Sequence, residues 1–313
     1  MVFWPLRKRG KRLASVSLEG DGLRYLELSG DRTSLRYERS AVVLPLPGAL
    51  KQDMVGDMEI LSRSLARLEE EAGRFASPVA VGIPSRDVLI RLVDMPPLSP
   101  DDAREALRWD FDRHFPFPAT DAAYDVAPLD LPGNGDEENR HYLVAACRLG
   151  LAEGLVGAVE ALGVTVSALE PLNLALFRAG LGPVDRFDGG HLQVHVGFET
   201  SEIMLGYREG GILFRTVMAG RAGGSEGLSS LAREVDATRA FIRSRFRDLS
   251  LEEIVVTGQR GIDEAFLSQI RGEGLLPVAH LSVEALWGIA GHRDEGPREG
   301  LEAAVGLCVR ALP

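Results

Sequence analysis

The same succession of elements is indicated twice along this 313-residue chain, and this repeat constrains the fold more than any other feature. Each half opens with three short apolar runs, continues with a long amphipathic helix and ends in alternating strands and helices. The apolar runs span 13–18, 23–28 and 34–44 in the first half and 192–196, 201–207 and 212–218 in the second. The helical patterns follow at 53–75 and 227–246. Periodicity therefore predicts an α/β protein of two related lobes.

The boundary between the lobes is expected in the stretch 180–190, which reads GLGPVDRFDGG and is dense in Gly and Asp. At roughly 150 residues per domain, the length of the chain also fits two domains. We therefore expect a basic tail at 1–12, a first lobe at 13–180 and a second lobe at 181–313.

Charge and cysteine content exclude several classes of protein. The chain carries 35 Lys and Arg against 46 Asp and Glu, a net charge of −11, which argues against a general nucleic-acid binder. No apolar run approaches the roughly 20 residues that span a bilayer. Cys147 and Cys308 lie in apolar contexts, so neither a disulfide scaffold nor a cysteine zinc site is expected. We expect a soluble, cytoplasmic protein.

The amino terminus combines apolar and basic residues in the order opposite to that of a secretory signal. Trp4 belongs to the apolar start, and the cations that follow are Arg7, Lys8, Arg9, Lys11 and Arg12. One interpretation is contact with an anionic membrane surface, to which each cation contributes about 1 kcal/mol. The other interpretation is a solvated tail that precedes the first strand.

A helix framed by prolines stands out in the first half, within the segment 91–126. Ser99 is a natural helix cap, and acidic residues occupy the first turn after it. Leu107 and Phe111 fall on one face of this helix, which ends before the sequence FPFP. Strands are expected around it at 87–93, 124–129 and 141–147.

The segment 91–126, RLVDMPPLSPDDAREALRWDFDRHFPFPATDAAYDV, resembles the inserted subdomain of the PilM family, the actin-like, FtsA-related cytoplasmic proteins of type IV pilus assembly. The stretch 167–179 (SALEPLNLALFRA) resembles that family's linker into the second half, and 303–312 (AAVGLCVRAL) its carboxy-terminal helix. The cytoplasmic domain of GspL, from type II secretion, is a more distant relative of similar topology. Because GspL continues into a transmembrane helix and this chain ends at Pro313 without one, the resemblance favours the PilM family.

The resemblance implies a bilobal actin-like ATPase fold with a small α/β subdomain inserted in the first lobe at about 84–165. Members with an active site hold ATP or ADP with Mg²⁺ between the lobes, on the turns that join the hairpin strands. The corresponding positions here are Gly20, Asp21 and Gly22 in the first turn, Gly197 and Thr200 in the second, and Gly258 and Gln259 on the adenosine side.

Each of these turns departs from the family pattern. Ser17 stands at the position of the first Asp and Glu19 at that of a glycine, His195 replaces the second Asp, and Gln259 replaces a glycine. A contact of Glu19 or Asp21 with a polyphosphate is repulsive by roughly 4 kcal/mol at an effective dielectric near 20. We therefore expect a weakened or lost ATPase without catalytic or metal-binding residues. Alternatively, the glycines simply serve the hairpins of an inherited fold.

By resemblance, the leading hypothesis is a scaffold that binds the amino-terminal cytoplasmic tail of a PilN-type membrane protein. The groove for this tail would involve Ile90, Val93, Leu107 and Phe111. Further partners would be other components of the inner-membrane platform and cytoplasmic motors, so the protein would lie peripheral to the inner membrane. Two other hypotheses stay open: an actin-like ATPase with Asp21 near the metal, and a filament-forming protein.

Overall fold

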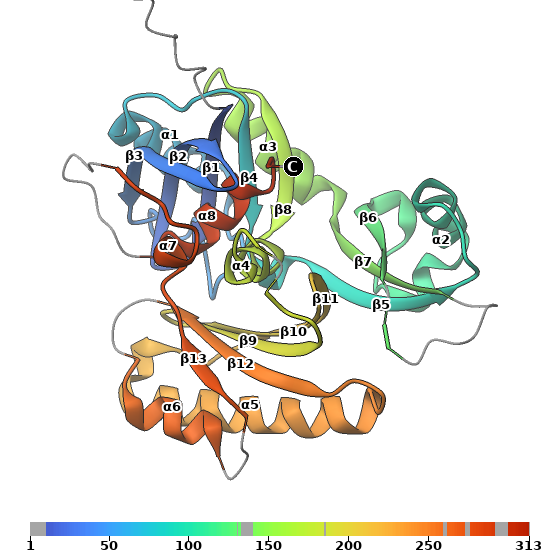
Figure 1. Ribbon diagram of the computed structural model, residues 1–313. Helices are drawn as coiled ribbons and strands as arrows, with labels where there is room; N and C mark the ends of the chain where they lie inside the picture. Colours follow the sequence, from blue (N-terminus) through green and yellow to red (C-terminus); the bar gives the residue numbers. More distant parts are fainter. Residues whose placement is uncertain are drawn as a thin grey trace, which may run out of the picture.

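The computed structural model describes residues 11–129, 131–132, 140–184, 186–258, 262–272, 276–291 and 300–312. Two five-stranded sheets share one arrangement of strands (Figure 1). The first consists of β1 (Lys11–Glu19), β2 (Gly22–Asp31), β3 (Ser34–Val43), β4 (Val79–Ile83) and β8 (Val166–Pro171). The second consists of β9 (Gly190–Val196), β10 (Ser201–Tyr207), β11 (Gly210–Val217), β12 (Leu251–Gly258) and β13 (Val278–His280). The strand orders, β3-β2-β1-β4-β8 and β11-β10-β9-β12-β13, match position by position.

Each sheet begins as an antiparallel meander and continues with parallel strands. β1 pairs antiparallel with β2, from Lys11 opposite Gly30 to Glu19 opposite Gly22, and it lies parallel to β4. β9 has the same relation to β10 and β12. The β1–β2 turn and the β9–β10 turn therefore occupy equivalent places in the two lobes.

Helices cover both sheets, and one helix lies between them (Figure 1). The covering helices are α1 (Met58–Ala72) and α3 (Leu149–Glu160) on the first sheet and α5 (Gly224–Arg245) and α6 (Glu264–Arg271) on the second. α4 (Leu172–Leu181) contacts strands of both sheets, including β8 and β11, and so lies between the lobes. None of the helices in the described ranges is long and apolar enough to cross a membrane.

A separate small sheet projects from the first lobe (Figure 1). Its strands, in spatial order, are β5 (Leu89–Met95), β7 (Arg140–Arg148) and β6 (Ala122–Leu129). α2 (Pro100–His114) packs on this sheet and begins as the sequence predicts, because the Ser99 hydroxyl accepts the N–H of Asp102 at 3.2 Å. The sequence places the end of the insertion near residue 165, whereas α3 packs against α1 in the first lobe. The inserted subdomain therefore ends with β7 at Arg148.

The last helix, α8 (Glu302–Val309), packs in the first lobe, although the expected boundary assigns it to the second. It contacts β1, β2 and α4, since every residue after Glu302 in this helix is buried and small or apolar. The Ser15 hydroxyl on β1 donates to the carbonyl of Ala304 at 2.8 Å. α8 therefore belongs to the first lobe, together with β1.

Gly306 on α8 allows this close packing, because a Cβ there would lie 1.8 Å from the carbonyl oxygen of Ala175 on α4. We expect Gly306→Ala to push the two helices apart and to lower the free energy of unfolding by about 2 kcal/mol. The matched control is Gly157→Ala in α3, where a Cβ meets nothing within 4 Å and alanine favours the helix by roughly 0.5–1 kcal/mol. Urea denaturation measures both variants, and equal stabilities would contradict the tight α4–α8 contact.

Candidate functional site

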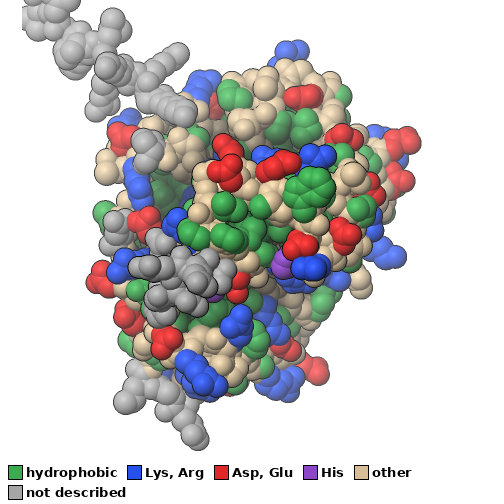
Figure 2. Space-filling model, turned by 90° about the vertical axis from the view of Figure 1, so that its right-hand side faces the viewer, with side chains coloured by type: hydrophobic (Ala, Val, Ile, Leu, Met, Phe, Trp, Pro, Cys, Tyr) green, Lys and Arg blue, Asp and Glu red, His purple; other side chains and the backbone are tan. Residues whose placement is uncertain are grey.

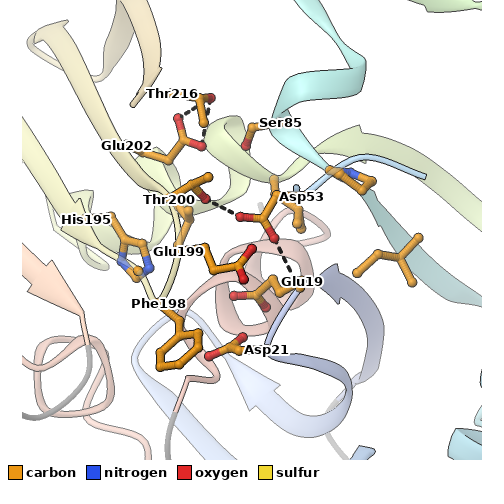
Figure 3. Close-up of a pocket in the computed structure, with 16 residues that line it drawn as sticks. Glu19, Asp21, Asp53, Ser85, His195, Phe198, Glu199, Thr200, Glu202 and Thr216 are labelled. Atoms are coloured by element: carbon orange, nitrogen blue, oxygen red, sulfur yellow. Dashed lines mark hydrogen bonds between the residues drawn. The ribbon is translucent and has the colours of Figure 1, made fainter. Parts of the chain in front are cut away.

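A small cavity lies between the two lobes, where the β1–β2 turn faces the β9–β10 turn (Figure 3). Its volume is about 50 Å³. Carboxylates dominate the lining: Glu19, Asp21, Asp53, Glu199 and Glu202. No Lys or Arg is among the described residues that line it. The sequence-predicted positions Gly20, Asp21, Gly197 and Thr200 are therefore brought together, but around an acidic cavity.

Asp53 links the two turns. One of its carboxylate oxygens accepts the backbone N–H of Gly20 in the first lobe at 2.8 Å. The other accepts the hydroxyl of Thr200 in the second lobe, as the dashed lines of Figure 3 show. A Cβ at Gly20 would lie 2.4 Å from the nearer Asp53 oxygen, so the glycine allows this approach. The sequence reasoning did not include Asp53, which comes from the connection between β3 and α1.

The segment that carries Asp53, residues 44–57, is called the Asp53 loop below. Gln52 and Asp53 have φ values of 51° and 52°, in the left-handed region that costs non-glycine residues energy. Two side chains just after β4 hold this segment in place. The Arg86 guanidinium donates to the Gln52 carbonyl at 2.6 Å, and the Asp87 carboxylate accepts the N–H of Val55 at 2.7 Å.

Arg24 on β2 neutralises two of the carboxylates that were expected to repel a polyphosphate. This buried guanidinium lies 2.9 Å from Asp21 and 3.3 Å from Glu19. Burial raises the pKa of Glu19 to about 7, and the positive charge of Arg24 opposes that rise. The guanidinium of Arg24 is therefore paired with carboxylates of the protein itself. The sequence does not predict this pairing.

Glu202 on β10 is a buried carboxyl on the second-lobe side of the cavity. The Thr216 hydroxyl lies 2.9 Å from each of its oxygens and donates to them. Burial raises the pKa of Glu202 to about 7; hydrogen bonds from Thr216 and Ser85 lower it, and the charge of Asp53 raises it further. Near neutral pH this group therefore exchanges between its neutral and its charged form.

His195 is an interior histidine. It is buried at the end of β9, and its Nδ1 lies 3.3 Å from the Thr257 hydroxyl. Burial lowers its pKa to about 4, so the imidazole is neutral at pH 7. Among the described residues, no group of His, Cys, Asp and Glu side chains is arranged to hold a metal ion.

Gly22 and Gly258, two further positions from the sequence prediction, are not among the residues that line the cavity. Gly22 begins β2 beside Arg24. Gly258 ends β12 with a φ of 131°, and a Cβ there would lie 2.4 Å from the carbonyl oxygen of Val196. This glycine serves the close approach of β12 to β9. Gln259 lies outside the described residues.

The residues of this cleft do not fit a nucleotide. Pockets that bind small molecules have volumes of about 300–1,000 Å³, whereas this cavity has about 50 Å³. The carboxylate of Asp53 holds the Gly20 N–H and the Thr200 hydroxyl, which are donors that an anionic ligand would need. The carboxylates of Asp53 and Glu199 in the same lining repel a polyphosphate. No chemical step is therefore assigned to ATP or ADP here.

The four residues expected to line a partner groove are mostly interior. Val93, Leu107 and Phe111 are buried in the core between α2 and the small sheet. A docked peptide cannot reach these side chains, which corrects the expectation that they line the groove. Their periodic apolar pattern reflects packing within the small subdomain. Ile90 is half-buried and packs against the core of the first lobe.

Of the basic residues at the amino terminus, Arg12 has a side chain in the described part of the structure. It is exposed, and its guanidinium lies 3.3 Å from the buried carboxylate of Glu27. Lys11 begins β1. Trp4, Arg7, Lys8 and Arg9 lie outside the described residues.

Comparison with known proteins gives one family match and several structural ones. The family model described as type IV pilus assembly protein PilM matches residues 16–179. A solved structure described as a PilM–PilN type IV pilus biogenesis complex aligns with a TM-score of 0.76 at 20% identity, covering 98% of this chain and 99% of the other.

Two further solved structures have the same fold at lower similarity. The cytoplasmic domain of EpsL, an inner-membrane component of the type II secretion system of Vibrio cholerae, has a TM-score of 0.51 at 15% identity and covers 89% of this chain and 93% of its own. A Bacteroides thetaiotaomicron protein with an actin-like ATPase fold and unknown function has a TM-score of 0.51 at 10% identity and covers 98% and 99%. The bilobal actin-like fold and the type II secretion relative expected from the sequence are thereby confirmed.

The raised pKa of Glu202 makes stability depend on pH. A carboxyl whose pKa is higher in the folded than in the unfolded protein keeps its proton on folding, so wild-type stability falls as pH rises from about 4.5 to about 7. We expect Glu202→Gln, which keeps an acceptor for Thr216, to exceed wild type by about 3 kcal/mol at pH 8 and to match it near pH 4.5. Urea denaturation at both pH values measures this difference.

The control for this measurement is Glu264→Gln, which changes an exposed carboxylate on α6. Its stability relative to wild type should be the same at both pH values. A Glu202→Gln difference that does not change with pH would contradict the raised pKa.

Proposed function

Because the chain belongs to the family of the type IV pilus assembly protein PilM, we propose that it is a scaffold of the inner-membrane assembly platform of type IV pili. In this role it binds the amino-terminal cytoplasmic tail of a PilN-type membrane protein. The observation that carries this proposal is the family match, which spans the first lobe with the small sheet. The similar PilM–PilN complex supports the choice of partner.

A binding function fits the state of the interlobe cleft. Association through a surface requires neither a metal nor a positioned water, so it tolerates turns that have lost the phosphate-binding pattern. The cavity of about 50 Å³ and the carboxylate that links the turns do not favour the ATPase hypothesis. We therefore place the activity on the surface of the first lobe.

The proposed site for the tail is the junction of the first lobe and the small sheet. Figure 2 views the molecule from the side on which the small subdomain projects, where hydrophobic and charged side chains lie next to one another. β5 lies at the edge of the small sheet, paired with β7 on one side and close to β11 of the second lobe, and Ile90 on β5 packs against the first-lobe core. An extended tail can add a strand to the part of such an edge that keeps free backbone groups, while apolar neighbours receive alternate side chains.

The location of the protein in the cell is part of the same proposal. A partner tail that emerges from the membrane places the protein at the cytoplasmic face of the inner membrane. The basic segment 7–12 would add attraction to an anionic leaflet, at about 1 kcal/mol per cation. Other platform components and the cytoplasmic motors are the further partners that such a scaffold would join.

The direct test is fluorescence anisotropy with a labelled synthetic amino-terminal peptide of a PilN-type protein. We expect saturable binding with the same Kd in the presence and absence of Mg·ATP. Ile90→Arg should weaken binding about tenfold or more, a loss of roughly 1.4 kcal/mol, because it places a charge in the proposed junction.

Phe241→Arg is the matched control, since Phe241 is a 46% exposed apolar residue on α5 in the second lobe. This variant should bind the peptide as wild type does. Thermal unfolding must show that both variants fold. Absence of peptide binding to wild type, with and without nucleotide, would overturn the scaffold proposal, and equal loss in both variants would overturn the proposed position.

A further inference from the structure

The Asp53 loop contacts three parts of the molecule at once. Through the Asp53 carboxylate it accepts hydrogen bonds from Gly20 in the first lobe and Thr200 in the second. Hydrogen bonds to a charged group contribute about 1.5–3 kcal/mol each, so this carboxylate is a substantial link between the lobes. Figure 3 shows Asp53 between the two turns, pointing into the cavity that separates them.

The third contact is with the segment that leads into the small sheet. Arg86 and Asp87, which hold the backbone at Gln52 and Val55, lie in the turn Ser85–Asp87 that leads into β5. A movement of β5 relative to the first lobe would therefore displace the Asp53 loop. The backbone of the Asp53 loop is bonded to the segment that leads into the small sheet, and the Asp53 carboxylate is bonded to both lobes. The loop therefore connects the small sheet to both lobes.

The conformation of the loop indicates that these contacts hold it under strain. Gln52 and Asp53 are consecutive non-glycine residues in the left-handed region, at a cost of about 1–2 kcal/mol for Gln52 and less for Asp53, whose short polar side chain tolerates this region. Asp53 also places its charge beside Glu19 and Glu199 in the same cavity. Such a loop remains in place only because its hydrogen bonds outweigh the backbone strain and the repulsion.

We propose that the two turns form an anion site whose resident ligand is the chain's own Asp53 carboxylate, and that this internal ligand couples closure of the lobes to the position of the small sheet. The ligand class is a carboxylate, supplied from within the chain. The second part of the proposal rests on the scaffold function: a tail bound at the junction of the first lobe and the small sheet would favour one state of the cleft. The state of the cleft would then change the affinity for the tail by the same factor.

The test uses pulsed electron paramagnetic resonance distances between spin labels on introduced cysteines. Ala66→Cys on α1 and Ala240→Cys on α5 report the separation of the lobes, and Ala66→Cys with Ala106→Cys on α2 reports the small sheet; all three sites are exposed. The native Cys147 and Cys308 are buried, and burial raises the pKa of their thiols, so they react slowly with the label.

Three substitutions distinguish the effect of the Asp53 carboxylate from that of the other charges in the cavity. Asp53→Gly removes the carboxylate and tolerates the positive φ, and Asp53→Asn keeps the shape without the charge. Glu199→Ala is the charge control, because it removes a carboxylate from the same cavity and its repulsion of Asp53 while both hydrogen bonds of Asp53 stay in place. We expect narrow distributions in wild type and Glu199→Ala, longer and broader ones in Asp53→Gly for both label pairs, and an intermediate result in Asp53→Asn.

Added formate tests the anion site itself. In Asp53→Gly, formate should fill the place of the missing carboxylate and restore the narrow distributions, while chloride at the same ionic strength should not. Distributions in Asp53→Gly that equal those of wild type would overturn the link between the lobes. Failure of formate alone to restore them would overturn the anion site.

Peptide binding tests the coupling separately. Asp53→Gly should change the Kd of the PilN-type peptide about fivefold or more, whereas Glu199→Ala should leave it unchanged. If wild type binds the peptide and Asp53→Gly binds it equally well, the coupling is wrong and the scaffold function stands. If wild type binds no peptide, the scaffold function and the coupling both fail, and the distance measurements still decide whether Asp53 joins the lobes.

Discussion

A hydrogen-bonded carboxylate joins the lobes of this protein at the point where related folds have their turns for phosphate. Asp53 accepts the Gly20 N–H from one lobe and the Thr200 hydroxyl from the other, and both donors lie in equivalent hairpin turns. The cavity that remains has a volume of about 50 Å³. The contact joins equivalent turns of the two sheets, and the loop between β3 and α1 supplies its carboxylate. The two lobes are therefore held together at this point by a side chain of the protein itself.

Charged and titratable groups near the cleft make their contacts within the protein. The basic residue near the first turn, Arg24, is buried against Glu19 and Asp21 and does not line the cavity. His195 is held neutral by burial. By contrast, the first lobe carries a projecting sheet with an edge strand, and the family match covers this part of the chain. The proposed scaffold function therefore uses the surface of an actin-like fold and not its interlobe cleft.

Sequence patterns predicted the elements that depend on local periodicity and capping. The repeated succession of strands and helices and the α2 helix after Ser99 follow from residues close together in the chain. Features that depend on long-range contacts were missed. Asp53 lies 33 residues from Gly20 and 147 from Thr200, and nothing in its neighbourhood marks it as a ligand. The same limit applies to α8, which packs in the first lobe although the sequence places it in the second, and to Phe111, which lies inside the small subdomain although the sequence places it in a groove.

The most direct test of a cleft closed by the chain's own carboxylate is isothermal titration calorimetry of the wild-type protein with Mg·ATP. We expect no saturable heat at ligand concentrations up to about 1 mM, since Asp53 already holds the donors of both turns. Stoichiometric binding with a micromolar Kd would contradict this conclusion, because it would show that the cleft opens readily and admits a triphosphate despite the carboxylate between its turns.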